Sequence, residues 1–226
     1  MSKETDQLSR SWIANAPAWC DAVREMRIES RRVVTDAAIV AAVLHGSPRR
    51  VLDVGCGEGW LARSLAEGGI DVTGVDASTP LIDAARTLGG ATFLAMSYQQ
   101  IAADPSSLGS GFDTIVANFS ILDDDAEELL RALRSMLSDS GRLIIQTAHP
   151  LLAEGAYVDG WRTETFDAFP GEWPESMPWY FRTLGSWSRL LASAGYVIAE
   201  IREPMYPDRP VPASMMFVCN SPVSIS

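Results

Sequence analysis

The sequence predicts an α/β fold, a doubly wound and mainly parallel β-sheet with helices on both faces. Residues 49–149 alternate strand-like apolar runs with helix-like segments, and such alternation is typical of parallel strands joined by right-handed helical crossovers. The first apolar run ends in a cluster of glycines, as strand-to-helix turns often do. With 226 residues, the chain is long enough for one such domain with an elaboration.

Four zones follow one another along the chain. Residues 1–48 are predicted to be helical in two pieces, and the second piece, 33–44, is alanine-rich and stops before Gly46 and Pro48. Residues 49–149 carry the alternating pattern. In chain order, we expect strands at 49–54, 71–76, 91–96, 112–120 and 142–150, and helices at 60–69, 80–90 and 123–141. We expect the three acids at 123–125 to serve the N-terminus of that long helix.

The last two zones are predicted to differ in regularity. Residues 150–182 are expected to be irregular, and residues 157–187 hold nine of the chain's 19 aromatic side chains. A long loop inside a compact domain is often a lid or a binding loop; the alternative is a hydrophobic cluster that folds the loop onto the core. In the zone 183–226, we expect a helix at 186–195 and strands at 196–204 and 214–220. These two strands pair antiparallel, because the loop between them is too short for a helical crossover.

Composition and charge narrow the possible classes of protein. Hydrophobic residues make up 47% of the chain and charged residues 21%, which is typical of a globular protein and argues against disorder. The net charge of −11 disfavours a nucleic-acid binder, which usually carries a basic face. The three cysteines are far apart and form no C-x-x-C pair, so neither a metal site nor a disulfide framework is expected. A polar N-terminus without a long apolar run predicts a cytoplasmic protein that does not span the membrane.

The sharpest motif is VLDVGCGEGW, which covers residues 51–60. Its glycines allow a tight turn that brings a ligand against the main chain, at the N-terminus of the next helix. A dinucleotide fingerprint, G-x-G-x-x-G, would need its third glycine where Trp60 stands, so a pyrophosphate site is disfavoured. Asp76 ends the next strand, where a carboxylate can accept hydrogen bonds from a ribose diol. The alternative for Asp76 is a cap on the following helix, which Ser78 or Thr79 also offers.

Taken together, these motifs make residues 49–149 resemble a class I S-adenosylmethionine-dependent methyltransferase. VLDVGCGEGW resembles the first motif of that family, VTGVDAS the second, FDTIVANFSIL the fourth-strand motif and GRLIIQTAHP the fifth strand. The resemblance implies a Rossmann-like, seven-stranded sheet in the order 3-2-1-4-5-7-6, with the last strand antiparallel. His149-Pro150 and Glu203-Pro204 extend the resemblance to a subgroup of small bacterial methyltransferases with diverse substrates.

The resemblance also implies where the cofactor, S-adenosyl-L-methionine, binds. Its methionine end would lie against the glycine turn, its ribose at the second strand end and its adenine after the third strand. Many members have an acid after the third strand to meet the adenine amino group, and in this chain Ser97 is the expected substitute. The cofactor-binding residues carried over in this way are Asp53, Gly55, Cys56, Gly57, Asp76, Ala77, Ser78, Ser97, Tyr98, Asn118 and Phe119.

The substrate is expected at the carboxyl ends of the strands, where ligands of open parallel sheets bind. We expect the N-terminal helix and residues 150–182 to form a cover over the cofactor's methyl group. His149 is the candidate base, because histidine titrates near neutrality; the alternative is a packing role at the strand end. The arginines either clamp an anionic substrate or pair with acids such as Glu164, and core packing is the alternative for the aromatics. The candidate substrate-binding residues are Trp19, Arg31, Trp161, Arg162, Tyr180 and Arg182.

The predicted function is methyl transfer to a small molecule, anionic or aromatic, by in-line displacement. In this chemistry the protein supplies alignment, dry surroundings and, where needed, a base. The alternative is a protein that binds the same cofactor without methyl transfer, such as a regulator or a cyclase. Nucleic-acid methylation is disfavoured further, because the chain lacks the Asn-Pro-Pro-Tyr motif of amino-methylating DNA enzymes. The acceptor atom, the need for a base and the oligomeric state are left open by the sequence.

Overall fold

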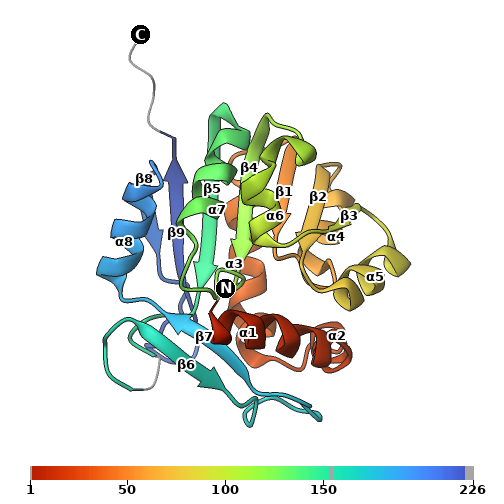
Figure 1. Ribbon diagram of the computed structural model, residues 1–226, viewed down its shortest axis with the longest axis vertical. Helices are drawn as coiled ribbons and strands as arrows, with labels where there is room; N and C mark the ends of the chain where they lie inside the picture. Colours follow the sequence, from red (N-terminus) through yellow and green to blue (C-terminus); the bar gives the residue numbers. More distant parts are fainter. Residues whose placement is uncertain (1, 153–154, 222–226) are drawn as a thin grey trace.

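A seven-stranded sheet with the strand order β3-β2-β1-β4-β5-β9-β8 lies at the centre of the computed structural model, which describes residues 2–152 and 155–221 (Figure 1). Strands β1 to β5 run parallel, and β9 lies antiparallel to both β5 and β8. The strands are Arg50–Val54 (β1), Asp71–Asp76 (β2), Thr92–Ala95 (β3), Phe112–Asn118 (β4), Leu137–Thr147 (β5), Val197–Arg202 (β8) and Met215–Asn220 (β9). Because β8 and β9 are the sixth and seventh strands of this sheet along the chain, the expected order and the antiparallel last strand are confirmed.

The strands carry apolar side chains on both faces, because helices cover both. On β1, Leu52 belongs to one buried cluster and its neighbour Val51 to the other, as the two-residue period of a strand requires. The first cluster lies under α6 (Tyr98–Ala103), α7 (Glu127–Met136) and α8 (Leu184–Ser193). The second cluster lies under α3 (Asp36–Leu44), α4 (Trp60–Glu67) and α5 (Thr79–Leu88). The expected two-sided covering of the sheet is therefore present.

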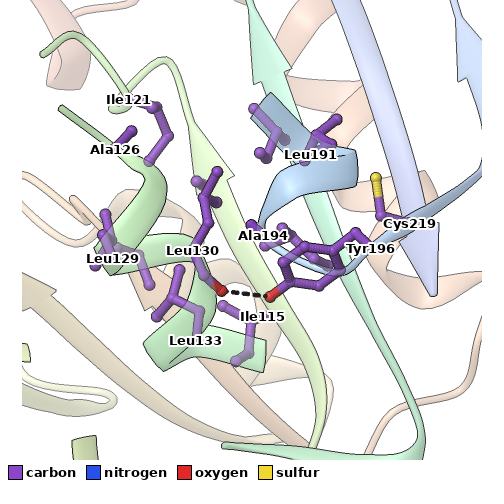
Figure 2. Close-up of a cluster of buried hydrophobic side chains, with 14 of the residues drawn as sticks. Ile115, Ile121, Ala126, Leu129, Leu130, Leu133, Leu191, Ala194, Tyr196 and Cys219 are labelled. Carbon is purple, nitrogen blue, oxygen red and sulfur yellow. Dashed lines mark hydrogen bonds between the residues drawn. The ribbon is translucent and has the colours of Figure 1, made fainter. Parts of the chain in front are cut away.

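A tyrosine ties α7 to the strand pair at the edge of the sheet. Tyr196 precedes β8, and its hydroxyl donates to the carbonyl of Leu130 in α7 at 3.1 Å. Figure 2 shows this hydrogen bond inside the cluster, with the ring beside Ala194 and Cys219. The bond satisfies a buried hydroxyl that would otherwise weaken the core, and burial raises the pKa of Tyr196.

The helix expected at 123–141 is shorter than predicted at both ends. It begins at Glu127 and ends at Met136, and Leu137 is already extended and pairs with Phe112. Serines and aspartate at 138–140 are weak helix formers, and a side chain at Gly141 would lie 2.6 Å from the carbonyl oxygen of Phe112. Residues 137–141 therefore extend β5. The acids at 123–125 precede the helix, and its first turn contains two other acids, Glu127 and Glu128.

The zone expected to be irregular contains a hairpin. β6 (Gly160–Glu164) and β7 (Met177–Phe181) pair antiparallel in a second, two-stranded sheet. Residues 153–154 of this zone lie outside the described residues. Two short elements were also not predicted. They are α6, which a reciprocal capping box of Ser97 and Gln100 starts, and the 3₁₀ turn η2 (Pro105–Leu108).

The N-terminal zone is helical, as expected, but its described residues form three α-helices instead of the two pieces predicted. Two of these helices lie at the carboxyl ends of the parallel strands. α1 (Lys3–Ala14) packs against β7, and α2 (Ala16–Arg24) packs against α5. A π-helical turn, η1 (Arg31–Thr35), leads into α3. Figure 1 shows α1, α2 and the β6–β7 hairpin together beyond the ends of β4 and β5. Among the described residues, no helix has both the length and the hydropathy to cross a bilayer.

Candidate functional site

The glycine turn after β1 is held against β2 by its own backbone. The amides of Gly55 and Cys56 both donate to the carbonyl of Val75, at 2.7 and 3.0 Å. Gly55, Gly57 and Gly59 all have positive φ, at 73°, 57° and 83°, a region that favours glycine. Because α4 begins directly after this turn, its free N-terminal amides face the same end of the sheet.

Gly55 also lies under two other segments, and this close approach gives a testable prediction. A side chain there would lie 2.3 Å from Ser120 Cβ and 2.9 Å from the hydroxyl of Tyr98. We expect Gly55→Ala to lower the free energy of unfolding by about 3 kcal/mol, from strain plus overpacking. Gly69 is the matched control, because it has φ of 83° but nothing within 4 Å of an added Cβ. Gly69→Ala should cost only about 1 kcal/mol in urea unfolding, and equal losses in both variants would contradict the crowding at Gly55.

Asp76 at the end of β2 joins the glycine turn to the next loop. Its Oδ2 accepts from the amide of Gly57 at 2.9 Å, and its Oδ1 accepts from the amide of Ser78 at 2.8 Å. Each carboxylate oxygen has further lone-pair capacity, so the carboxylate can still accept from a diol. Ala77 beside it is exposed and Ser78 is buried. Asp76 therefore joins the two loops and does not cap α5, whose N-cap residue is Ser78, and it has acceptor capacity left for a ligand.

A second carboxyl group lies buried behind the turn. Asp53 on β1 is 1% exposed, and its Oδ2 has no hydrogen-bond partner within the described chain. Burial, with a smaller contribution from the charge of Asp76, raises the pKa of Asp53 to about 7. Burial likewise raises the pKa of Asp76 and of the Cys56 thiol. A cationic ligand group beside these carboxyl groups would offset the cost of their desolvation and would pair with the free oxygen of Asp53.

The segment after β3 reaches toward the same turn. Ser97 Oγ accepts from the amide of Gln100 at 3.2 Å, and the amide of Ser97 donates to Gln100 Oε1 at 2.8 Å. The Ser97 hydroxyl oxygen is therefore engaged as a helix cap. The hydroxyl of Tyr98 donates to the carbonyl of Ser120 at 2.8 Å. Because that hydroxyl also lies over Gly55, the Tyr98 side chain crosses from the third strand to the glycine turn.

The end of β4 carries backbone strain. Phe119 has φ of 54° although it is not glycine, and its amide donates to the carbonyl of Gln146 at 2.7 Å. Non-glycine residues in this region are uncommon, and they cluster at functional sites. The side chain of Asn118 is held from β5, where Gln146 Nε2 donates to Asn118 Oδ1 at 2.9 Å.

The N-terminal helices lie over the glycine turn. The indole nitrogen of Trp19 in α2 lies 3.6 Å from the position a Cβ would take at Gly57, and its ring packs edge-on against Trp12 at 5.2 Å. Arg31 lies over the ring of Trp60, 4.7 Å from the centroid, and forms an ion pair with Asp36 at 3.0 Å. Trp60 is the first residue of α4. Trp19 and Arg31 are therefore placed on the cofactor side of the predicted site.

A buried ion-pair cluster fastens α2 to the turn. Glu58, whose side chain is 1% exposed, lies 3.2 Å from Arg24 Nε of α2 and 2.7 Å from Arg63 NH2 of α4. Removing one partner of the buried Glu58 carboxylate is costly, so these ion pairs hold α2 against the glycine turn. Sequence reasoning missed Glu58, although a charged residue between two glycines of the motif was a usable signal.

The other substrate candidates lie on the β6–β7 hairpin, which packs against α1 through β7. Trp161 on β6 packs edge-on against Tyr180 on β7, with ring centroids 5.5 Å apart. Arg162 lies over the ring of Phe181, 3.5 Å from its centroid, and donates to the carbonyl of Ala156 at 2.7 Å. These contacts show that the aromatics pack among themselves, and that the hairpin presents a partly exposed aromatic and cationic face.

Arg182 differs from Arg162 because it is buried. It is 4% exposed, lies over the rings of Tyr180 and Trp187 at 4.9 and 5.2 Å, and donates to the carbonyl of Asp123. Its NH1 has no hydrogen-bond partner among the described residues, and burial lowers its pKa. Asp123 in turn accepts from the hydroxyl of Thr5 at 2.8 Å, so this acid connects α1 to the loop after β4 and does not cap α7. Burial raises the pKa of Asp123.

His149 follows β5, and both of its ring nitrogens are engaged. The amide of Leu151 donates to Nδ1 at 3.3 Å, and Nε2 lies 2.8 Å from Glu203 Oε1. Because Nδ1 accepts, the proton belongs on Nε2, which donates to the carboxylate. The ring is 4% exposed. In this arrangement His149 has no free nitrogen to take a proton from a substrate.

No group of three or more metal-ligating side chains that could hold an ion occurs in the described ranges.

The chain is similar in sequence to known methyltransferases. A family model described as a methyltransferase domain matches residues 24–201. Over 101 residues, the chain is 35% identical to a ubiquinone biosynthesis O-methyltransferase of Cereibacter sphaeroides; the match covers 43% of the chain and 40% of the relative. The chain spans less than half the length of the curated relatives it matches.

Two solved structures share the fold. An S-adenosylmethionine-dependent methyltransferase from Mesorhizobium loti superposes with a TM-score of 0.62 at 21% identity, over 84% of this chain and 97% of that one. A magnesium protoporphyrin IX methyltransferase from Synechocystis, with bound S-adenosylhomocysteine (SAH), gives a TM-score of 0.58 at 21% identity, over 85% and 83% of the two chains. At these identities the likeness extends to the fold alone.

Proposed function

The chain belongs to the methyltransferase-domain family, and on that premise we propose that it transfers the methyl group of S-adenosyl-L-methionine to a small molecule. The observation that carries the proposal is the pair of carboxyl groups at the glycine turn, Asp53 buried and Asp76 half-buried. Asp53 Oδ2 accepts no hydrogen bond from any described residue, and Asp76 has acceptor capacity beyond its two backbone bonds. An amino acid nucleoside with an ammonium, a sulfonium and a ribose diol matches this set of acceptors.

The chemical types of the residues around the turn match the functional groups of that ligand. The ribose diol is assigned to Asp76, and the methionine ammonium to the side of Asp53. The positive φ values of Gly55 and Gly57 leave the main chain open to close approach. Cys56, Ala77, Ser78, Ser97, Tyr98 and Phe119 complete the proposed cofactor site. Asn118, at the end of β4, is assigned to the place where the cofactor's methionine part meets the reaction zone. Arg31, expected at the substrate, is reassigned to the cofactor's carboxylate, because it lies beside the first residue of α4 and above the turn.

When bound, S-adenosylmethionine supplies an electrophilic methyl group on a positively charged sulfur. The chain contributes a dry, aromatic environment in front of it. Trp19 lies over the turn, and it packs edge-on against Trp12 at 5.2 Å and against Trp173 at 6.2 Å. Aromatic faces stabilise cations by about 0.5–2 kcal/mol each, and excluded water strengthens the contacts within.

The acceptor is proposed to be an anionic or aromatic molecule that enters beside the hairpin. Trp161 and Tyr180 supply aromatic surface there, and Arg162 and Arg182 supply charge. Support for an oxygen as the methylated atom comes from the name of the curated relative, an O-methyltransferase. Because both nitrogens of His149 are engaged, we assign His149 to holding the end of β5 against Glu203. An acceptor oxygen that is already acidic would need no base from it.

The proposed function can be tested with methyl-labelled S-adenosylmethionine and a panel of small hydroxylated aromatic acids. We expect SAH and a labelled product to form only when an acceptor is present. Binding of SAH with no turnover on any acceptor would favour the alternative, a cofactor-binding protein without methyl transfer. No heat of binding with either S-adenosylmethionine or SAH would contradict the cofactor assignment itself.

A further inference from the structure

Gln146 is a fully buried amide in β5 that points toward the helix α3 side of the sheet. It is 0% exposed, and it lies two residues after Ile144, which belongs to the cluster under α3. Its Nε2 donates to the backbone carbonyl of Thr35 at 3.1 Å and to Asn118 Oδ1 at 2.9 Å. Thr35 ends the π-helical turn η1. A single amide therefore connects the N-terminal zone, β5 and the end of β4.

This connection fixes which way round both amides lie. The oxygen and nitrogen of an amide side chain are assigned from the hydrogen-bond network, and a backbone carbonyl can only accept. The carbonyl of Thr35 therefore requires the NH2 group of Gln146 on its side. The same nitrogen also faces Asn118, so Asn118 must present its oxygen to Gln146. The planar amide then directs Asn118 Nδ2 away from Gln146.

Asn118 Nδ2 is available to a ligand. Asn118 is half-buried, and its Nδ2 donates to no residue in the parts of the chain that the structure describes. Two residues later, Ser120 donates to the carbonyl of Val54 at 2.6 Å and lies against Gly55. The end of β4 thus lies beside the glycine turn. Asn118 therefore lies at the same end of the sheet as the proposed cofactor site.

We propose that Gln146 is a positioning residue that fixes Asn118 as a hydrogen-bond donor and thereby selects acceptor molecules that present an oxygen over those that present an amine. This inference rests on the proposed function. An oxygen of the acceptor can receive an N–H bond from Asn118 whether it is a phenolate, a carboxylate or a hydroxyl. A primary amine needs a hydrogen-bond acceptor for its own N–H groups. The side-chain oxygen of Asn118, which could accept from an amine, already accepts from Gln146.

The arrangement of the two amides is tested without cofactor or substrate by NMR of their side-chain NH2 groups. Gln146→Met and Asn118→Asp assign the two signals by deletion, and Asn220 supplies a reference amide at an exposed position at the opposite end of the sheet. We expect the Gln146 protons to exchange with water at least about tenfold more slowly than those of Asn220. We also expect Gln146→Met to shift the Asn118 signals. Through-bond correlations from each side-chain NH2 group to its own backbone assign the same signals in the wild-type protein. Equal exchange at Gln146 and Asn220 there would therefore overturn the proposal even if the variants failed to fold.

The selectivity is tested with para-hydroxybenzoate and para-aminobenzoate, which differ only in the group that Asn118 would meet. Their dissociation constants are measured by calorimetry on the SAH complex. We expect wild type to favour the hydroxyl compound and Asn118→Asp to lose that preference by about tenfold, the effect of one hydrogen bond. Gln146→Met should reduce the preference similarly, and adding it to Asn118→Asp should change nothing further. Asn220→Asp is the matched control and should leave the preference unchanged.

The outcomes distinguish a failure of the positioning role of Gln146 from a failure of the proposed acceptor or cofactor. A preference that survives Gln146→Met would contradict the positioning role, as would additive effects in the double variant. If neither benzoate binds the SAH complex, the anionic aromatic acceptor of the proposed function is wrong, and the amide exchange measurement alone decides on Gln146. If SAH itself does not bind, the cofactor assignment is wrong.

Discussion

Asp53→Asn is expected to make the protein more stable at high pH and weaker in binding S-adenosylmethionine. The carboxyl of Asp53 is buried, and desolvation raises its pKa from 3.8 to about 7. Between these two values the unfolded chain loses its proton while the folded chain keeps it, so stability falls as pH rises. Asparagine cannot ionise and removes this dependence. The cationic cofactor loses a negative partner in the same variant.

The size of the effect follows from the pKa. Between about pH 5 and pH 8, ionisation of Asp53 should cost the wild type about 2–3 kcal/mol of unfolding free energy that the variant does not lose. Urea unfolding at the two pH values measures this difference, and the exposed Asp139→Asn is the matched control. In wild type, affinity for S-adenosylmethionine should fall as pH drops below 7, because Asp53 then binds a proton. If the unfolding free energy of the variant had the same pH dependence as that of wild type, folding would not raise the pKa of Asp53.

Asp76→Ala is expected to weaken binding of SAH by about 10–100-fold. This corresponds to about 1.5–3 kcal/mol, the range for hydrogen bonds to a charged group. The variant loses the proposed ribose contacts and also releases the amides of Gly57 and Ser78, which Asp76 holds at 2.9 and 2.8 Å. Because the released amides lie in loops and not in the core of the sheet, the loss should appear in SAH affinity more than in the free energy of unfolding.

The matched control for Asp76 lies on the same strand. Asp71 begins β2, is exposed, and lies 3.9 Å from Arg50 in a surface ion pair. Asp71→Ala should leave SAH affinity within about twofold of wild type, because surface pairs contribute little. Calorimetry on both variants decides the matter. An Asp76→Ala variant that binds SAH as tightly as Asp71→Ala would place the ribose elsewhere.

The parallel core could be predicted because its signals are local. Glycines with positive φ, an acid at the end of the next strand and apolar runs of strand length lie within a few residues of one another. The sheet order came from the resemblance, and the structure confirms it. The boundary between α7 and β5 could not be predicted in this way. It depends on Leu137 pairing with Phe112, a contact that no window of sequence reveals.

The β6–β7 hairpin was missed for a related reason. Its strands are separated by residues 165–176 and pair through aromatic contacts such as Trp161 with Tyr180, without a short turn signal between them. The partner of His149 is also far away in the sequence. Glu203 follows β8 and contacts the ring of His149 at the end of the sheet. Sequence spacing predicted which residues would carry chemistry. It could not show which of their polar atoms are engaged in the fold.

We propose that the cofactor lies on the glycine turn beneath the N-terminal helices, and a crystal structure of the SAH complex tests this placement. We expect both ribose hydroxyls within about 2.6–3.2 Å of the Asp76 carboxylate. We also expect the amino group on the side of Asp53 and the ring of Trp19 against the ligand. SAH bound away from Asp76, or a ligand with Trp19 and the α1–α2 segment displaced from the turn, would contradict it.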